Sequence, residues 1–238
     1  MSQHLYILTG GSRGMGLAIA EQLLQNGHTL ICISRNTQSS LTDLAQKEGA
    51  VLEQWSHDLA DGASASIALM NWLQAHSSDE FQSATLINNA GVIGHLGPMT
   101  PQSDELLQQT LAINLQAPMQ LTAAFLTATR AWHASKKVVN ISSGLGRRAM
   151  AGSSMYCASK AGMDHYSRCV ALEEADLPHG VRIVSLAPGV IDTDMQSDLR
   201  AGDEQQFPER ENFVKLKATG ALSSPDEAAT RVLAYLNR

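Results

Sequence analysis

Short apolar runs alternate with amphipathic segments along most of the chain. Apolar runs of about four to eight residues that end in glycine or polar residues are typical of strands buried on both faces of a parallel sheet. Apolar residues that recur three or four positions apart are typical of helices that cover such a sheet. The pattern predicts strands at residues 5–9, 29–34, 51–55, 84–87, 137–143 and 182–187. It predicts helices at residues 17–27, 39–47, 63–75, 100–130, 156–175 and 224–236.

This alternation predicts an α/β fold: a Rossmann-type doubly wound parallel sheet of about six or seven strands, with helices on both faces and right-handed crossovers. The 238 residues suffice for one large core and no Pro/Gly/Ser-rich linker divides them, so we expect a single domain over residues 1–238. Residues 190–219 lose the periodicity and become polar. We expect them to form an irregular lid over a substrate.

Composition narrows the range of partners without naming one. The chain is 44% hydrophobic and 17% charged with a net charge of −6, which argues against binding to nucleic acid or to an anionic membrane. No apolar stretch approaches the length of a membrane span, and the N-terminus lacks the pattern of a signal peptide. The three cysteines lie far apart without metal-ligand spacing. We therefore expect a cytoplasmic protein without a metal site.

A glycine-rich turn follows the first predicted strand. Gly10-Gly11-Ser12-Arg13-Gly14-Met15-Gly16 stands between the apolar run of residues 5–9 and a helical pattern. Such a turn allows backbone N–H groups to approach a phosphate, and the positive end of the helix dipole favours the anion. Its place between strand and helix makes it a stronger signal of dinucleotide binding than glycines alone.

The second predicted strand ends in Arg35 rather than in an acid. In dinucleotide-binding folds this position meets the adenosine ribose, where an acid binds a free 2′-hydroxyl and an arginine neutralises a 2′-phosphate. Together with Arg13 in the glycine turn, Arg35 favours NADP(H) over NAD(H). The alternative is that both are ordinary surface arginines, which is a weaker explanation for the pair than for either residue alone.

Two groups of amides continue the pattern. The run Asn88-Asn89-Ala90-Gly91 follows the strand at residues 84–87, and its composition suits a tight edge against a ligand. Asn114 stands among apolar residues inside the long predicted helix. A buried asparagine needs hydrogen-bond partners, so Asn114 is either a structural bridge or a functional group that clamps the backbone or relays protons through water.

Ser143 ends the predicted strand at residues 137–143, and Tyr156 and Lys160 come after it. Residues four apart on a helix share one face, so Tyr156 and Lys160 are expected to reach a common ligand. A tyrosine titrates near ~10, and an ammonium at ~4 Å would lower that value by at most roughly three units. We therefore expect Lys160 to lower the pKa of Tyr156 and to fit it for general acid catalysis. Without the surrounding motifs, a surface tyrosine near a lysine would be unremarkable.

With these motifs in order, the chain closely resembles the short-chain dehydrogenase/reductase family over nearly its whole length. The family's glycine motif corresponds to residues 9–16, its Asn-Asn-Ala-Gly to residues 88–91, and its Tyr-x-x-x-Lys to Tyr156 and Lys160. The resemblance implies a catalytic tetrad of Asn114, Ser143, Tyr156 and Lys160. It implies cofactor contacts from Gly10, Ser12, Arg13, Gly14, Met15, Gly16, Arg35, Asp58, Leu59, Asn88, Ala90, Gly91, Tyr156, Lys160, Pro188, Gly189, Val190 and Thr193.

Within the family, residues 34–36 and the run of residues 188–200 look like the sepiapterin reductase and benzil reductase branch. This implies an NADPH-dependent carbonyl reductase that transfers a hydride to an aromatic or aliphatic ketone or diketone, with Tyr156 as the general acid. The alternatives are an NADP-dependent alcohol dehydrogenase or a sepiapterin reductase-like enzyme and, in a different class, a non-catalytic NADP(H)-sensing regulator. Small residues at 158, 161 and 162 allow close helix packing within a monomer or across a dimer, and the family's habits favour a homodimer or a tetramer.

Overall fold

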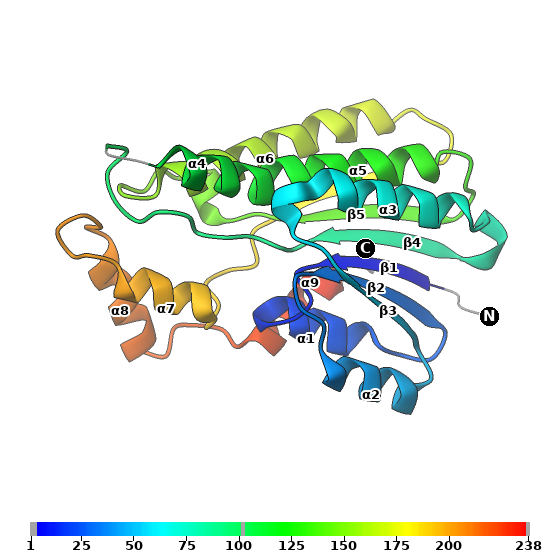
Figure 1. Cartoon of the computed structure of the whole chain (residues 1–238), viewed down its shortest axis with the longest axis horizontal. Helices are drawn as coiled ribbons and strands as arrows, with labels where there is room; N and C mark the ends of the chain where they lie inside the picture. Colours follow the sequence, from blue (N-terminus) through cyan, green and yellow to red (C-terminus); the bar gives the residue numbers. More distant parts are fainter. Residues whose placement is uncertain (1–3, 101–102, 237–238) are drawn as a thin grey trace.

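The computed structural model describes residues 4–100 and 103–236, and its centre is a parallel sheet of six strands in the order β3-β2-β1-β4-β5-β6 (Figure 1). The strand order reverses between β1 and β4, which opens a crevice at the carboxyl ends of these two strands. The predicted doubly wound α/β fold is confirmed. The strands are β1 (His4–Thr9), β2 (His28–Ser34), β3 (Val51–Ser56), β4 (Ser83–Asn88), β5 (Ser135–Ile141) and β6 (Arg182–Leu186).

Helices cover both faces of the sheet, as Figure 1 shows. One face carries α1 (Gly14–Leu23), α2 (Ser39–Glu48) and α9 (Pro225–Leu236), and the other carries α3 (Gly62–Gln74), α5 (Ala117–Ala128) and α6 (Ser154–Glu174). Successive strand residues point to opposite faces, so Leu8 and Ile87 pack toward α1 and α9 while Ile7 and Leu86 pack toward α3 and α5. These four side chains are fully buried, which explains the continuous apolar runs in the sequence.

The long helix predicted over residues 100–130 is three segments. They are α4 (Asp104–Leu111), a π-helical turn (Ala112–Gln116) and α5. The helix begins later than predicted because Ser103 is its N-cap, accepting a hydrogen bond from the backbone of Leu106 at 3.4 Å. Thr100 lies before this cap, and Pro101 lies outside the described residues. Asn114 stands in the middle of the π-helical turn.

The segment of residues 190–219 is helical, which corrects the prediction of an irregular lid. It contains α7 (Asp194–Ala201) and α8 (Arg210–Ala218), which Figure 1 places beside the carboxyl ends of the strands. These short helices have few apolar residues, and they pack on a small hydrophobic cluster that is separate from the two clusters flanking the sheet. Its buried members are Ile93, Met150, Tyr156, Leu199, Phe207 and Phe213. We call residues 190–219 the lid.

Candidate active site

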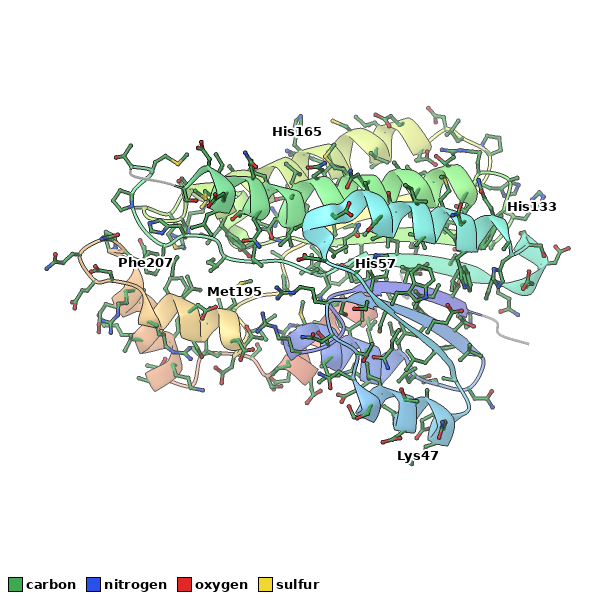
Figure 2. All side chains as sticks on the ribbon, in the orientation of Figure 1. Lys47, His57, His133, His165, Met195 and Phe207 are labelled. Atoms are coloured by element: carbon green, nitrogen blue, oxygen red, sulfur yellow. The ribbon has the colours of Figure 1, made fainter. Side chains whose placement is uncertain are left out.

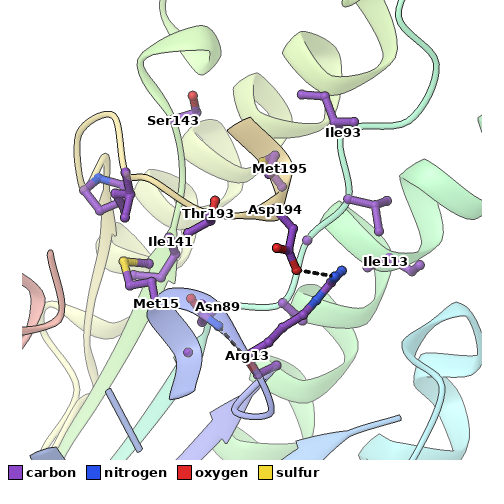
Figure 3. A pocket seen from close by; sticks show the side chains of 18 of the residues that line it. Arg13, Met15, Asn89, Ile93, Ile113, Ile141, Ser143, Thr193, Asp194 and Met195 are labelled. Atoms are coloured by element: carbon purple, nitrogen blue, oxygen red, sulfur yellow. Dashed lines mark hydrogen bonds and ion pairs between the residues drawn. The ribbon is translucent and has the colours of Figure 1, made fainter. Parts of the chain in front are cut away.

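The carboxyl ends of the strands and the lid enclose a cavity of about 620 Å³, within the range of ~300–1,000 Å³ that is typical of ligand pockets. Figure 3 shows part of its lining. Of the predicted site residues, it is lined by Gly10, Ser12, Arg13, Gly14, Met15, Gly16, Arg35, Asp58, Leu59, Ala90, Gly91, Ser143, Tyr156, Lys160, Pro188, Gly189, Val190 and Thr193. Asn88 and Asn114 are not among the lining residues.

The glycine turn is built for close approach. A Cβ on Gly16 would lie 2.0 Å from the carbonyl oxygen of Gly10, so only glycine fits where α1 meets the turn. Gly10 has φ +71°, which favours glycine, and its N–H donates to Ile33 of β2 at 2.8 Å. The N-cap of α1, Arg13, makes no side-chain cap. The first turn of α1 therefore presents uncapped N–H groups to the cavity, and this cradle fits a phosphate.

The two arginines predicted to bind a 2′-phosphate differ in their surroundings. Arg13 forms an ion pair with Asp194 of α7, with 2.9 Å between Nη1 and Oδ2 (Figure 3). Arg35 lines the cavity, is exposed, and has no ion-pair partner in the described part of the chain. Asp58 is beside it on the cavity wall and accepts a hydrogen bond from the backbone of Ala60 at 3.0 Å. Of these two arginines, Arg35 is thus the one whose guanidinium has no ion-pair partner among the described residues.

The side chains of the last residue of β4, Asn88, and of the next residue, Asn89, point to different places. Asn88, predicted to contact the cofactor, is fully buried in the core, where its amide donates to Asn140 of β5 at 2.8 Å. Asn89, which belongs to the predicted run but was not among the predicted cofactor contacts, lines the cavity and donates to the carbonyl of Thr9 at 3.0 Å. Since strand residues alternate between faces, the second asparagine is the one that turns toward the strand ends.

Asn114 is fully buried and acts as a backbone clamp in this structure. Its Oδ1 accepts from the N–H of Val92 at 2.8 Å, and its Nδ2 donates to the carbonyl of Val92 at 2.8 Å and to Ser159 Oγ at 3.2 Å. A Cβ on Gly91 would lie 3.4 Å from Asn114 Oδ1 and 3.6 Å from Lys160 Nζ. Asn114 therefore fixes the segment after β4 beside Lys160.

Tyr156 and Lys160 lie together on the buried face of α6. Lys160 Nζ donates to the carbonyl of Ile141 at 2.7 Å and lies 5.7 Å from the centroid of the Tyr156 ring. Burial lowers the pKa of Lys160 to about 8, although the Asp164 carboxylate acts in the opposite direction. Burial also raises the pKa of Tyr156, and the Ser143 hydroxyl, bonded to the phenol, only partly offsets it.

The net shift of the Tyr156 pKa is upward, opposite to the predicted lowering, and the charge of Lys160 is not among its causes. The ring is 7% exposed, so removal of water from the phenolate outweighs the hydrogen bond from Ser143. A raised pKa leaves the phenol protonated at neutral pH. Such a group can donate a proton.

An apolar stretch of the cavity wall lies next to Tyr156. Ile93, Leu145, Met195, Leu199 and Phe213 line the part next to Tyr156. No local pattern in the sequence indicated this wall, because its residues come from the loop after β4, the loop after β5 and the lid. Scattered apolar residues in the otherwise polar residues 190–219 are the one signal that could have indicated a small buried cluster there.

Comparison with known proteins identifies the family. A model described as short chain dehydrogenase matches residues 4–204. The chain belongs to the short-chain dehydrogenase/reductase family. It is therefore an oxidoreductase, and the predicted family resemblance is confirmed.

Curated relatives of this short-chain dehydrogenase/reductase include two bacterial enzymes. The benzil reductase ((S)-benzoin forming) of Bacillus cereus is 38% identical over 95% of this chain and 91% of its own length. The enzyme of the same name from Bacillus subtilis is 37% identical over 98% of this chain and 93% of its own. Sepiapterin reductase of Mus musculus is 32% identical over 98% of this chain and 91% of its own.

Solved structures share the fold. A short-chain dehydrogenase/reductase from Burkholderia vietnamiensis superposes with a TM-score of 0.70 at 37% identity, covering 84% of this chain and 89% of its own. A protein from Agrobacterium tumefaciens, assigned as a candidate 2-deoxy-d-gluconate 3-dehydrogenase and solved with bound NADP, gives a TM-score of 0.77 at 26% identity, with coverages of 97% and 87%. No described helix is long and apolar enough to cross a membrane.

Proposed function

We propose that this oxidoreductase is an NADPH-dependent carbonyl reductase acting on ketones or diketones. The observation that carries the proposal is that one cavity is lined by the glycine turn, by Arg35, and by Ser143, Tyr156 and Lys160 together. A cofactor site alone would fit a sensor of NADP(H). The buried proton donor beside an apolar wall gives the site a reaction to perform.

The chain's own residues bind and polarise the carbonyl. Tyr156, kept protonated by burial, donates its proton to the carbonyl oxygen as that oxygen gains negative charge, and Ser143 donates a second hydrogen bond to the same oxygen. Lys160 presents its ammonium on the same helix face, where it would hold the nicotinamide ribose of a bound cofactor and favour the phenolate left after proton transfer. The bound cofactor supplies the hydride that reaches the carbonyl carbon.

The choice of NADP(H) rests on Arg35. Arg35 directly follows β2 and lines the same cavity as Asp58 and Leu59, and its charge is complementary to that of a 2′-phosphate. Structural relatives from Agrobacterium tumefaciens and Beutenbergia cavernae contain NADP, which agrees with this choice. Gly10, Ser12 and the first turn of α1 would hold the diphosphate. Pro188, Gly189, Val190 and Thr193 would line the nicotinamide side.

The substrate proposal rests on the apolar wall beside Tyr156. Leu145, Met195, Leu199 and Phe213 offer contact area to aromatic or aliphatic groups flanking a carbonyl. Two relatives are named as benzil reductases, and benzil is a diketone with two aromatic rings. We propose that residues 1–238 form one cytoplasmic catalytic domain with the lid at residues 190–219, and that it assembles as a homodimer.

The test is the substitution Tyr156→Phe, assayed with a panel of aromatic ketones and diketones and with NADPH and NADH in parallel. Loss of the proton donor is expected to reduce ketone-dependent NADPH oxidation by roughly 100- to 10,000-fold, while NADPH fluorescence titration shows retained binding. Tyr235→Phe on the exposed side of α9 is the matched control. Retained turnover in Tyr156→Phe, or NADPH binding without turnover by the wild type across the panel, would contradict the proposal.

A further inference from the structure

Asp164 is a buried carboxylate that the proposed reaction does not use. It lies on α6 one helical turn after Lys160, on the face that also carries Tyr156, and it is 7% exposed. A buried carboxylate is costly unless charged or hydrogen-bonding partners hold it. Its partners therefore show what its position achieves.

Two elements outside α6 bind Asp164. Arg147 Nε donates to Oδ2 at 3.1 Å, and the hydroxyl of Ser185 in β6 donates to Oδ1. Gly146 packs on the same turn, because a Cβ there would lie 3.0 Å from Asp164 Oδ2 and 2.9 Å from the carbonyl oxygen of Lys160. One carboxylate thus joins α6, the loop after β5, and β6.

Each of these elements leads directly into the cavity. The loop after β5 is a tight turn in which Gly146 N–H donates to the carbonyl of Ser143 at 3.0 Å, so anchoring Arg147 and Gly146 to α6 also anchors Ser143. Strand β6 continues into Pro188 and Gly189 of the cavity wall. Helix α6 itself carries Tyr156 and Lys160.

Asp164 also faces the charge of Lys160. Burial acts to raise the pKa of Asp164, but neighbouring serine hydroxyls and Arg147 prevail and leave it lowered, so the carboxylate is ionised at neutral pH. The titratable or charged groups around Lys160 are Tyr156 and Asp164 on its own helix and Arg147, whose side chain is 59% exposed, on the loop after β5. The groups that β5 and the segment after β4 place next to Lys160, the Ile141 carbonyl and Gly91, are neutral.

We propose that Asp164 is a positioning residue of the active site, which fixes the Ser143 loop against α6 and supports the charge of the Lys160 ammonium. This rests on the proposed reductase function. Arg147 and Asp164 have opposite charges in one ion pair, and both hold the same loop. Comparing the loss of the Asp164 charge with the loss of the Arg147 charge therefore separates an electrostatic effect of Asp164 on Lys160 from a purely structural role in holding the loop.

The experiment compares Asp164→Asn, Arg147→Gln and Glu173→Gln with the wild type. Glu173 is an exposed carboxylate on the same helix and serves as the control for loss of one charge. Two readouts are taken: the pH profile of kcat/KM for the ketone at saturating NADPH, and the titration of Lys160 by NMR of ¹³C-lysine-labelled protein without cofactor. The Lys160 signal is assigned from the spectrum of Lys160→Arg.

In the wild type, the Lys160 ammonium is lost as pH rises through its pKa of about 8. Asp164 raises that pKa, so Asp164→Asn is expected to move the titration and the basic limb of the profile to lower pH by roughly one unit. We expect kcat/KM at pH 7 to fall about tenfold through misplacement of Ser143. Arg147→Gln should also lower kcat/KM but leave the Lys160 titration unchanged or move it to higher pH.

Unchanged Lys160 titration in Asp164→Asn, or the same shift to lower pH in Arg147→Gln, would overturn the proposal. The NMR readout needs no turnover, so it separates this proposal from the proposed function: a wild type inactive toward every ketone refutes the function, whereas the titration still decides the role of Asp164. If Glu173→Gln shifts the titration as much as Asp164→Asn does, the effect is one of general charge, and the proposal fails.

Discussion

The two walls of the cavity are held in place in different ways. The wall at the strand ends consists of groups bonded to backbone or locked by close packing: Lys160 to the carbonyl of Ile141, Asn114 to Val92, and Gly16 against Gly10. The lid wall depends on a small apolar cluster and on surface ion pairs. Arg13 with Asp194 is one such pair, and both its side chains are mostly exposed.

This difference separates reaction from recognition. Buried hydrogen bonds to backbone are costly to break, so the strand-end wall keeps Ser143, Tyr156 and Lys160 in fixed positions. Exposed ion pairs contribute only about 0–1 kcal/mol, so the contacts between the lid and the glycine turn break at little cost. We expect the lid to adapt to different ketones while the proton donor stays in place.

The largest effect is expected from Gly16→Ala, which attacks the strand-end wall. Its Cβ would meet the backbone of Gly10 at 2.0 Å, so α1 must move away from the turn. We expect NADPH binding to weaken on the order of 100-fold, measured by fluorescence titration. Gly162→Ala is the control, because its Cβ would meet only the end of the Leu115 side chain. Equal binding by both variants would show that this wall tolerates movement.

A smaller and more local effect is expected from Phe207→Ala, which attacks the lid. Phe207 is fully buried and stacks on Phe213 with 5.8 Å between ring centroids. Removing a buried phenylalanine costs about 3–5 kcal/mol of packing, which here belongs to the lid. We expect the KM for ketone to rise at least about tenfold, with a smaller change in NADPH affinity. Leu172→Ala, at a 79% exposed site, is the control. Loss of NADPH binding as large as the change in KM would contradict a separate lid.

The effect with the narrowest scope, on one cofactor alone, is expected from Arg35→Gln at the solvent-facing rim of the strand-end wall. Loss of one hydrogen-bonded charge at a phosphate, about 1.5–3 kcal/mol, should weaken NADPH roughly 10- to 100-fold and leave NADH unchanged. Arg168→Gln removes the same charge from the exposed surface of α6 and serves as the control. Equal losses for both cofactors would assign Arg35 a general electrostatic role.

Local sequence signals predicted the strand-end wall well. Each of its signals depends on a few neighbouring residues: the glycine turn, the spacing of Tyr156 and Lys160, and the apolar strands. Short-range rules therefore suffice to predict these structures. The place of Asn89 in the cavity wall and the π-helical turn around Asn114 were not predicted. Both depend on how neighbouring elements pack, which short stretches of sequence do not show. The packing of the lid was not predicted for the same reason. Phe207 contacts Gly152 and Gly202, and no local periodicity in the sequence indicates these contacts.

The buried amides of Asn88 and Asn140 favour one register between β4 and β5. These residues are partners in the register of β4 and β5, and Asn140 also donates to Ser167 of α6 at 2.9 Å. A slip of one residue would turn one amide to the opposite face and leave buried polar groups without partners. The pair therefore sets the register of β4 and β5 inside the core. This register also determines how far Gly91, after β4, lies from Ser143, after β5.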